Sequence, residues 1–187
     1  YNNSYIRLNR NYSIRYYEDE EFRTLVHSRV ENPSNQLSLD LSECRNITDV
    51  SALGGVHTLS LSGCWNITDV SALSGVHTLN LHCCLNITDV SALGGVHTLD
   101  LSRCYNITDE SMSKLGKEGQ HTLILSSCLN ITDVSALGDV HTLNLSECYN
   151  ITDVSALGGV HTLYLRGCYN ITDVSALGDV HTLNLSG

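Results

Sequence analysis

One unit of 20 residues recurs along most of this chain, and no other feature limits its fold as strongly. Residues 56–75 read VHTLSLSGCWNITDVSALSG, and the unit returns with few changes at Val76, Val96, Val140, Val160 and Val180. The unit that begins at Val96 is four residues longer than the others. A repeat this short cannot bury an apolar face alone, so consecutive units must stack on one another. The sequence therefore predicts a solenoid.

The spacing of apolar residues changes from two to three within each unit. Leu59 and Leu61 alternate with polar residues, which is typical of a short strand with both leucines facing inward. After Cys64 the apolar residues recur every three positions, which indicates a turn of 3₁₀ character. The Leu-x-Leu pattern occurs eight times. We therefore expect an α/β-type solenoid with eight short strands in one parallel concave sheet and short 3₁₀ or helical turns on the convex side.

The spacing Val56-x-x-Leu59-x-Leu61-x-x-Cys64-x-x-Ile67 resembles the leucine-rich-repeat segment LxxLxLxxN/CxxL, with cysteine in the asparagine position. Cysteine followed by Ile-Thr-Asp resembles the cysteine-containing class of F-box-type adaptors. The Asp-Val-Ser-Ala-Leu ending and the short period resemble internalins, and the near-identity of the units resembles repeat arrays of giant DNA viruses. The match covers residues 37–187, and it implies a right-handed superhelix.

Residues 1–36 lie outside the repeat, so the chain divides into a capping segment, 1–36, and a solenoid of seven coils plus a final partial one, 37–187. The alternation of residues 5–8 and 12–16 around residues 9–11 suggests a small hairpin. An amphipathic helix is expected at residues 18–30, with Phe22, Leu25, Val26 and Val30 on one face. Such a segment would cover the core that the first coil otherwise exposes.

The longer unit predicts a true α-helix on the convex side at residues 109–117. Thr108 or Asp109 would cap this helix, and Met112 and Leu115 would face the core. Gly116 and Gly119 would permit its end.

The charge of the chain is concentrated in the repeats. Residues 37–187 carry five Lys or Arg and fifteen acids, which accounts for the whole net charge of −10. An acidic surface argues against nucleic-acid and membrane partners, and it favours a basic protein partner. No apolar run approaches the ~20 residues of a membrane-spanning helix. Open ends of the solenoid could also support self-association.

Seven of the eight cysteines fall at one position of the unit, which indicates small buried residues rather than disulfides. Asn-Ile-Thr, a formal glycosylation acceptor, also occurs seven times. Adjacent coils lie ~5 Å apart, too close for seven stacked glycans. We therefore expect structural asparagines and an intracellular, reducing compartment, either cytoplasmic or nuclear.

Differences between units are concentrated at outward-facing strand positions and on the loop that follows. A binding surface on one continuous face explains this pattern, and neutral drift at exposed positions is the alternative. Tyrosine, tryptophan and arginine are suitable anchors for a protein partner. The predicted partner-binding residues of the concave face and rim are Asn80, His82, Asp100, Arg103, Ile124, Asn144, Tyr164, Arg166, Trp65, Tyr105, Tyr149 and Tyr169.

Histidine and aspartate each recur once per coil. The histidines could form a pH sensor or a metal-binding stripe, but the usual ligand spacing is missing, and we expect each imidazole to bond to the next coil. One aspartate per coil supplies too few oxygen ligands for calcium, so these carboxylates are expected to cap the turns.

Catalysis has little support, because serine, histidine and cysteine recur in equivalent settings and none stands beside a unique base. Cys83, next to His82, is the one thiol outside the register. We predict no enzyme, no cofactor and no metal. The expected function is protein–protein interaction through the concave face. The alternatives are the substrate-recognition arm of an F-box-type ubiquitin ligase and a structural component of a particle or assembly.

Overall fold

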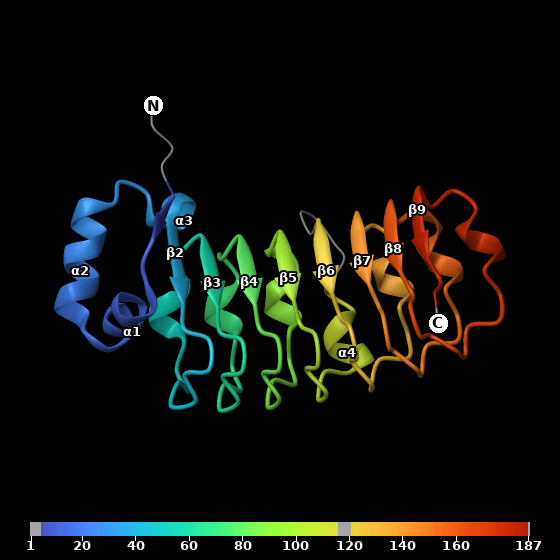
Figure 1. Ribbon diagram of the computed structural model, residues 1–187, viewed down its shortest axis with the longest axis horizontal. Helices are drawn as coiled ribbons and strands as arrows, with labels where there is room; N and C mark the ends of the chain where they lie inside the picture. The colour runs from blue at the N-terminus through green and yellow to red at the C-terminus, as the bar shows by residue number, and fades with distance from the viewer. Residues whose placement is uncertain (1–4, 116–120, 187) are drawn as a thin grey trace.

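The structure is a computed structural model, and it describes residues 5–115 and 121–186. Its strands form one parallel sheet in which each strand pairs with the next one along the chain (Figure 1). The strands are β1 (Ile6–Arg7), β2 (Leu37–Asp40), β3 (Thr58–Ser60), β4 (Thr78–Asn80), β5 (Thr98–Asp100), β6 (Thr122–Ile124), β7 (Thr142–Asn144), β8 (Thr162–Tyr164) and β9 (Thr182–Asn184).

Equivalent residues of neighbouring coils face each other throughout the sheet. Leu59 pairs with Leu79, and the register persists across the longer unit, where Leu99 pairs with Leu123. The eight repeat strands are therefore confirmed as β2 to β9. Strand β1 lies within residues 5–8, where the first strand of a hairpin was expected, but it pairs in parallel with Leu37 and Ser38 of β2 rather than with residues 12–16.

Short 3₁₀ turns lie behind the sheet, as the spacing of three predicted (Figure 1). They are η1 (Ser51–Leu53), η2 (Ser71–Leu73), η3 (Ser91–Gly95), η4 (Ser135–Leu137), η5 (Ser155–Gly159) and η6 (Ser175–Leu177). Between the sheet and the turns lies one continuous core of stacked Leu, Ile, Val and Cys side chains.

The longer unit contains an α-helix that is shorter than predicted. Helix α4 spans Asp109–Met112, and the chain then tightens, because the Leu115 amide donates to the Met112 carbonyl three residues back at 2.9 Å. Met112 and Leu115 are buried, as expected. Thr108 occupies the N-cap position without a side-chain bond. The predicted end at Gly116, Lys117 and Gly119 lies outside the described residues.

The hairpin expected in the first segment is wrong. Residues Arg10–Glu18 form helix α1, because the Asn9 side chain accepts a hydrogen bond from the Tyr12 amide and so caps a helical turn. Helices α2 (Glu20–Arg29) and α3 (Pro33–Gln36) follow. The expected helix at 18–30 is thus present, but Leu25 is 51% exposed, because α1 rather than α2 supplies the fully buried side chain, Tyr16.

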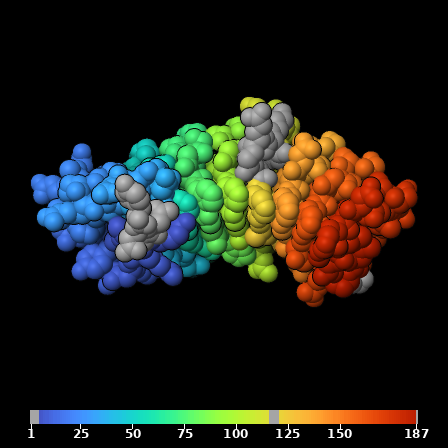
Figure 2. All heavy atoms as spheres, turned by 90° about the horizontal axis from the view of Figure 1, so that it is seen from above, coloured from blue at the N-terminus to red at the C-terminus, as the bar shows by residue number. Residues whose placement is uncertain are grey.

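The coils follow one another along the long axis of the molecule, so its colour runs in sequence order when it is seen from above (Figure 2).

Within residues 5–115 and 121–186, no helix is both long and apolar enough to cross a membrane.

Candidate binding surface

The outward side of the sheet carries one variable residue per strand. We call this row the sheet face: Asp40, Ser60, Asn80, Asp100, Ile124, Asn144, Tyr164 and Asn184. Every member is half-buried, and all but Asn184 alternate with buried leucines; Leu183 and Leu185 of the last strand are exposed. The parallel register brings these residues into one line along the sheet, as the sequence predicted.

Most of the sheet face has a local structural role. The side-chain oxygens of Asp40, Asn80, Asp100, Asn144 and Asn184 accept hydrogen bonds from the backbone N–H two residues later, at 2.8–3.1 Å. This Asx-type bond shapes the turn that leaves each strand. Ser60 instead bonds to Ser42 in the neighbouring coil at 2.7 Å. Ile124 and Tyr164 have no side-chain group that can make the Asx bond.

The next variable row lies in a left-handed turn, which the sequence analysis missed. Glycine fills this position at Gly63 and Gly167, with φ of +73° and +74°. The other members have φ between 58° and 62°, and they are Glu43, Cys83, Arg103, Ser127 and Glu147. The two glycines were the available signal, because glycine adopts positive φ without steric cost. Variation in this row therefore does not by itself indicate binding.

The loop after the turn carries the predicted aromatic anchors. We call this row the loop stripe: Arg45, Trp65, Leu85, Tyr105, Leu129, Tyr149 and Tyr169. The tryptophan and tyrosines are 39–70% exposed. Their rings also pack along the solenoid axis: the Arg45 guanidinium lies 4.0 Å from the Trp65 ring centroid, and Tyr149 stacks on Tyr169 at 6.2 Å.

The asparagines of the Asn-Ile-Thr motifs hold the loop stripe in place. From Asn66 to Asn170, each Nδ2 donates to the carbonyl of the stripe residue in the preceding coil at 2.6–2.8 Å. These bonds give the asparagines the structural role that was expected. The sheet face and the loop stripe are therefore both tied to a regular backbone.

The seven cysteines in register stack inside the core, whereas Cys83 is half-buried outside it. From Cys64 to Cys168, the Sγ of each cysteine in register donates a weak hydrogen bond to a leucine carbonyl of the preceding coil at 3.1–3.2 Å. Burial raises the pKa of Cys64 to about 11 and those of Cys84 and Cys148 to about 12. A thiol with so high a pKa is a poor nucleophile, which fits a packing role.

The aspartates act as the capping hypothesis predicted, with one exception. In six coils the aspartate Oδ1 accepts from the N–H of the serine two residues on, at 2.8 Å. These hydrogen bonds lower the pKa of the carboxyl groups, as for Asp49 and Asp69. In the longer unit Asp109 instead accepts from the amide and hydroxyl of Thr132 in the next coil.

The histidines form a stacked row with hydrogen bonds that differ from the expectation. Each Nδ1 lies 3.0–3.4 Å from the hydroxyl of the threonine that follows it, so the bond stays within the coil. The next coil contributes ring stacking instead. Desolvation lowers the pKa of His57, His77, His97 and His141, and neighbouring histidines lower it further in the last three.

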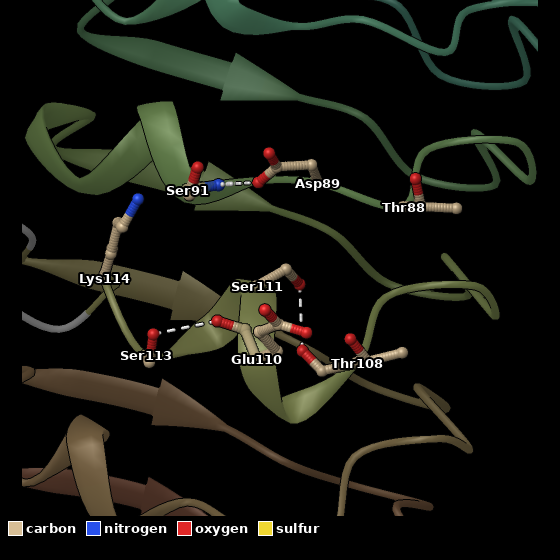
Figure 3. A pocket seen from close by; sticks show the side chains of 8 residues that line it. All are labelled: Thr88, Asp89, Ser91, Thr108, Glu110, Ser111, Ser113 and Lys114. Carbon is tan, nitrogen blue, oxygen red and sulfur yellow. Dashed lines mark hydrogen bonds between the residues drawn. The ribbon is translucent and has the colours of Figure 1, made fainter.

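A hollow of 480 Å³ lies away from the sheet face, between η3 and α4 (Figure 3). Hydroxyls, Asp89, Glu110 and Lys114 line it. Smaller hollows of 330 and 190 Å³, lined by the same kinds of residue, recur between later turns. Such hollows therefore follow from the stacking of the coils. No three metal-ligating side chains converge in the described parts of the chain.

No protein-family model and no curated protein matches the chain. Among solved structures, internalin C2 of Listeria monocytogenes str. 4b F2365 is 25% identical, with 82% of this chain and 72% of that chain covered and a TM-score of 0.58. Internalin F of the same strain is 21% identical, with 81% and 54% covered and a TM-score of 0.54, so this chain spans about half of its length.

A third match, a domain of InlJ from Listeria monocytogenes described as including a cysteine ladder, is 16% identical over 77% of this chain and 46% of that chain, and its TM-score of 0.27 is too low to support a structural argument. The fold of the first match agrees with the parallel sheet and the short 3₁₀ turns described above. This chain is therefore a leucine-rich-repeat solenoid with short, cysteine-containing repeats, and its fold is similar to that of the internalins.

Proposed function

We propose that the chain is a protein-interaction module that binds its partner on the sheet face, with Ile124 and Tyr164 of that face and the adjacent Arg166 at the centre of the contact. The solenoid offers a long surface on a rigid framework, and its coils differ mainly on this face. The proposal assigns no catalytic residue. The F-box-type arm and the structural component stay predictions.

The observation that carries the proposal is the break in the Asx pattern at β6 and β8. Ser60 of β3 also lacks the Asx bond, but its hydroxyl bonds to Ser42 instead. Asparagine or aspartate at this position makes a hydrogen bond that stabilises the coil, and Ile124 and Tyr164 give up that bond. A residue that departs from a local structural rule without a local gain is a candidate for function. Asn80, Asp100 and Asn144, which follow the rule, are therefore secondary members of the proposed surface.

The departures from the pattern lie close together. Ile124 pairs with Asn144, and Asn144 pairs with Tyr164, so the two residues lie two strand spacings apart, about 10 Å. Arg166 follows Tyr164 by two residues and is exposed. None of the ion pairs among the described residues involves its guanidinium. An apolar side chain, a tyrosine and an unpaired arginine together are typical of the centre of a protein interface.

The remaining predicted residues would extend this contact. Arg103 and the exposed rings of the loop stripe lie on the turn and loop that leave the sheet. The partner is expected to be a protein that places a carboxylate against Arg166, and basic groups elsewhere would suit the net charge of −10.

Replacing Ile124→Asn, Tyr164→Asn and Arg166→Ser together tests the proposal. The two asparagines restore the Asx bond, so the free energy of unfolding should not fall, whereas loss of three central contacts should weaken partner binding by roughly 30-fold or more. The partner is captured from cells that express the chain naturally, identified, and titrated calorimetrically against both proteins.

The matched control replaces three serines on the opposite side, Ser71→Ala, Ser91→Ala and Ser155→Ala. This variant should bind the partner as the unmodified chain does. If it weakens binding as much as the sheet-face variant, the assignment of the surface is wrong.

A further inference from the structure

The histidine ladder has no part in the binding surface proposed above. It consists of one histidine immediately before each strand from β3 to β9: His57, His77, His97, His121, His141, His161 and His181. Neighbouring ring centroids lie 4.2–5.0 Å apart, and the ring planes are inclined by only 10–18°. Tyr5 packs edge-on against His57 and ends the stack on that side.

Every ring of the ladder is oriented in the same way. Each Nδ1 is within hydrogen-bond distance of a threonine Oγ1, and this shared bond places each Nε2 on the opposite side of its ring. In the tautomer in which Nδ1 donates, Nε2 carries a free lone pair. Histidines that bind metals in proteins commonly donate their other N–H to an oxygen, which fixes the ring in this way.

We propose that neighbouring rings of the ladder chelate a divalent transition-metal ion, with one Nε2 from each of two adjacent coils and water at the other positions. Imidazole nitrogen suits Ni²⁺, Zn²⁺ and Cu²⁺, whereas Ca²⁺ and Mg²⁺ require oxygen ligands. The rings are at the surface or only half-buried, so an ion can approach them from solvent.

The geometry requires a modest adjustment. Metal–nitrogen bonds of about 2.0–2.1 Å place two adjacent ligand atoms about 3 Å apart. The stack spaces its rings more widely, and the pair His121 and His141 comes nearest, at 4.2 Å between centroids, with planes inclined by 18°. Because the lone pairs of nearly parallel rings point the same way, rotation about the side-chain bonds must both bring the two Nε2 atoms closer and tilt the two rings toward a shared ion. The site is therefore an open pair of ligands, which agrees with the absence of three converging ligands among the described residues.

Two variants with equal numbers of histidines distinguish chelation by pairs from binding to single imidazoles. The alternate variant carries His77→Gln, His121→Gln and His161→Gln, which leaves no two neighbouring rings. The block variant carries His57→Gln, His77→Gln and His97→Gln, which leaves four rings in an unbroken stack. Cys83→Ser is included in every protein, because this half-buried thiol could also take up the ion.

NiCl₂ is titrated calorimetrically into each untagged full chain at neutral pH. A second ligand held beside the first acts at a high effective concentration, so we expect Ni²⁺ binding to weaken by about 100-fold in the alternate variant. The block variant should keep the original affinity with fewer ions per chain. Equal losses in both variants, or no tight binding to the unmodified ladder, would overturn the proposal.

Circular dichroism checks that each variant is folded. If the alternate variant is not folded, the number of Ni²⁺ ions bound by the unmodified ladder still distinguishes chelation by pairs from binding to single imidazoles. Its seven rings contain at most three separate neighbouring pairs, so chelation saturates at no more than three tightly bound ions per chain. Seven equivalent weak sites would contradict chelation.

Discussion

In the described part of the chain, five residues other than glycine have a positive φ, a backbone conformation that glycine adopts more easily. Arg103 is one of them, with φ of 58°, and its side chain is exposed. A side chain in the left-handed region costs roughly 1–2 kcal/mol because its Cβ crowds the following carbonyl. This conformation is nevertheless stabilised by a hydrogen bond to the next coil: the Arg103 N–H donates to the Ser126 carbonyl at 2.9 Å.

Replacing Arg103→Gly should therefore stabilise the fold. The free energy of unfolding should rise by about 1 kcal/mol, since relief of the strain exceeds the greater freedom of glycine in the unfolded chain. Urea denaturation measures the change. The control is Gly63→Ala at φ of +73°, where the new Cβ would also meet the Glu43 carboxylate, and it should lose stability. A loss of stability in Arg103→Gly would refute the argument from strain.

At the scale of elements, the first coil depends on helix α1. We propose that residues 1–36 form a cap, because α1 contacts both β2 and α2 and buries Tyr16 completely. The Ser13 hydroxyl also accepts a hydrogen bond from the Asp40 amide at 3.1 Å, which satisfies a donor of the sheet.

Replacing Tyr16→Ala should detach this cap. Loss of a fully buried aromatic ring should lower the free energy of unfolding by about 3–5 kcal/mol. Leu25→Ala is the control on α2, where the side chain is 51% exposed, and it should change stability by less than about 0.5 kcal/mol. Thermal and urea unfolding compare the two. Equal effects would show that α1 does not anchor the segment.

At the scale of the whole molecule, the histidine ladder should make stability depend on pH. The folded-state pKa values of His57, His77, His97 and His141 are lowered, so the unfolded chain binds more protons once the pH falls below about 6.5. The ladder's contribution to the free energy of unfolding is complete above that pH. It is lost as the pH falls toward the lower pKa values that the histidines have in the folded state. The carboxyl groups that cap the 3₁₀ turns, such as those of Asp49 and Asp69, have lowered pKa values and stay ionised through this range.

Urea denaturation at pH 7.5 and pH 5.5 measures this loss, and NMR titration of the ring protons gives the pKa values. The alternate histidine variant should lose less stability between the two conditions. Folded-state pKa values above 6.5 for these histidines would contradict the prediction.

The cysteines bear on the compartment, which stays a prediction. All eight are free in the structure, and the seven in register are buried. Thiol titration of denatured, unreduced protein from its natural source should therefore find close to eight thiols per chain. A value near two or zero would show disulfides, and it would overturn the reducing compartment expected from the sequence.

The sequence by itself determined the coil. The period, the two leucines of each strand, the 3₁₀ turns and the capping aspartates follow from spacing along the chain, and repetition made the same inference possible many times. The sequence did not predict the helix at Arg10–Glu18. This segment is not repeated, its alternation of residues also fitted a hairpin, and Asn9 was interpreted as part of a turn rather than as a helix cap.

The tertiary structure decided what the variable positions do. Asn80 and Ile124 occupy the same place in their coils, yet only the first has a side chain that bonds to the departing backbone. Histidine rings that are 20 residues apart in sequence stack within 5 Å. These differences depend on dihedral angles and on distances between neighbouring coils. Spacing along the chain does not encode those quantities, because one periodic pattern is compatible with several bonding arrangements between coils.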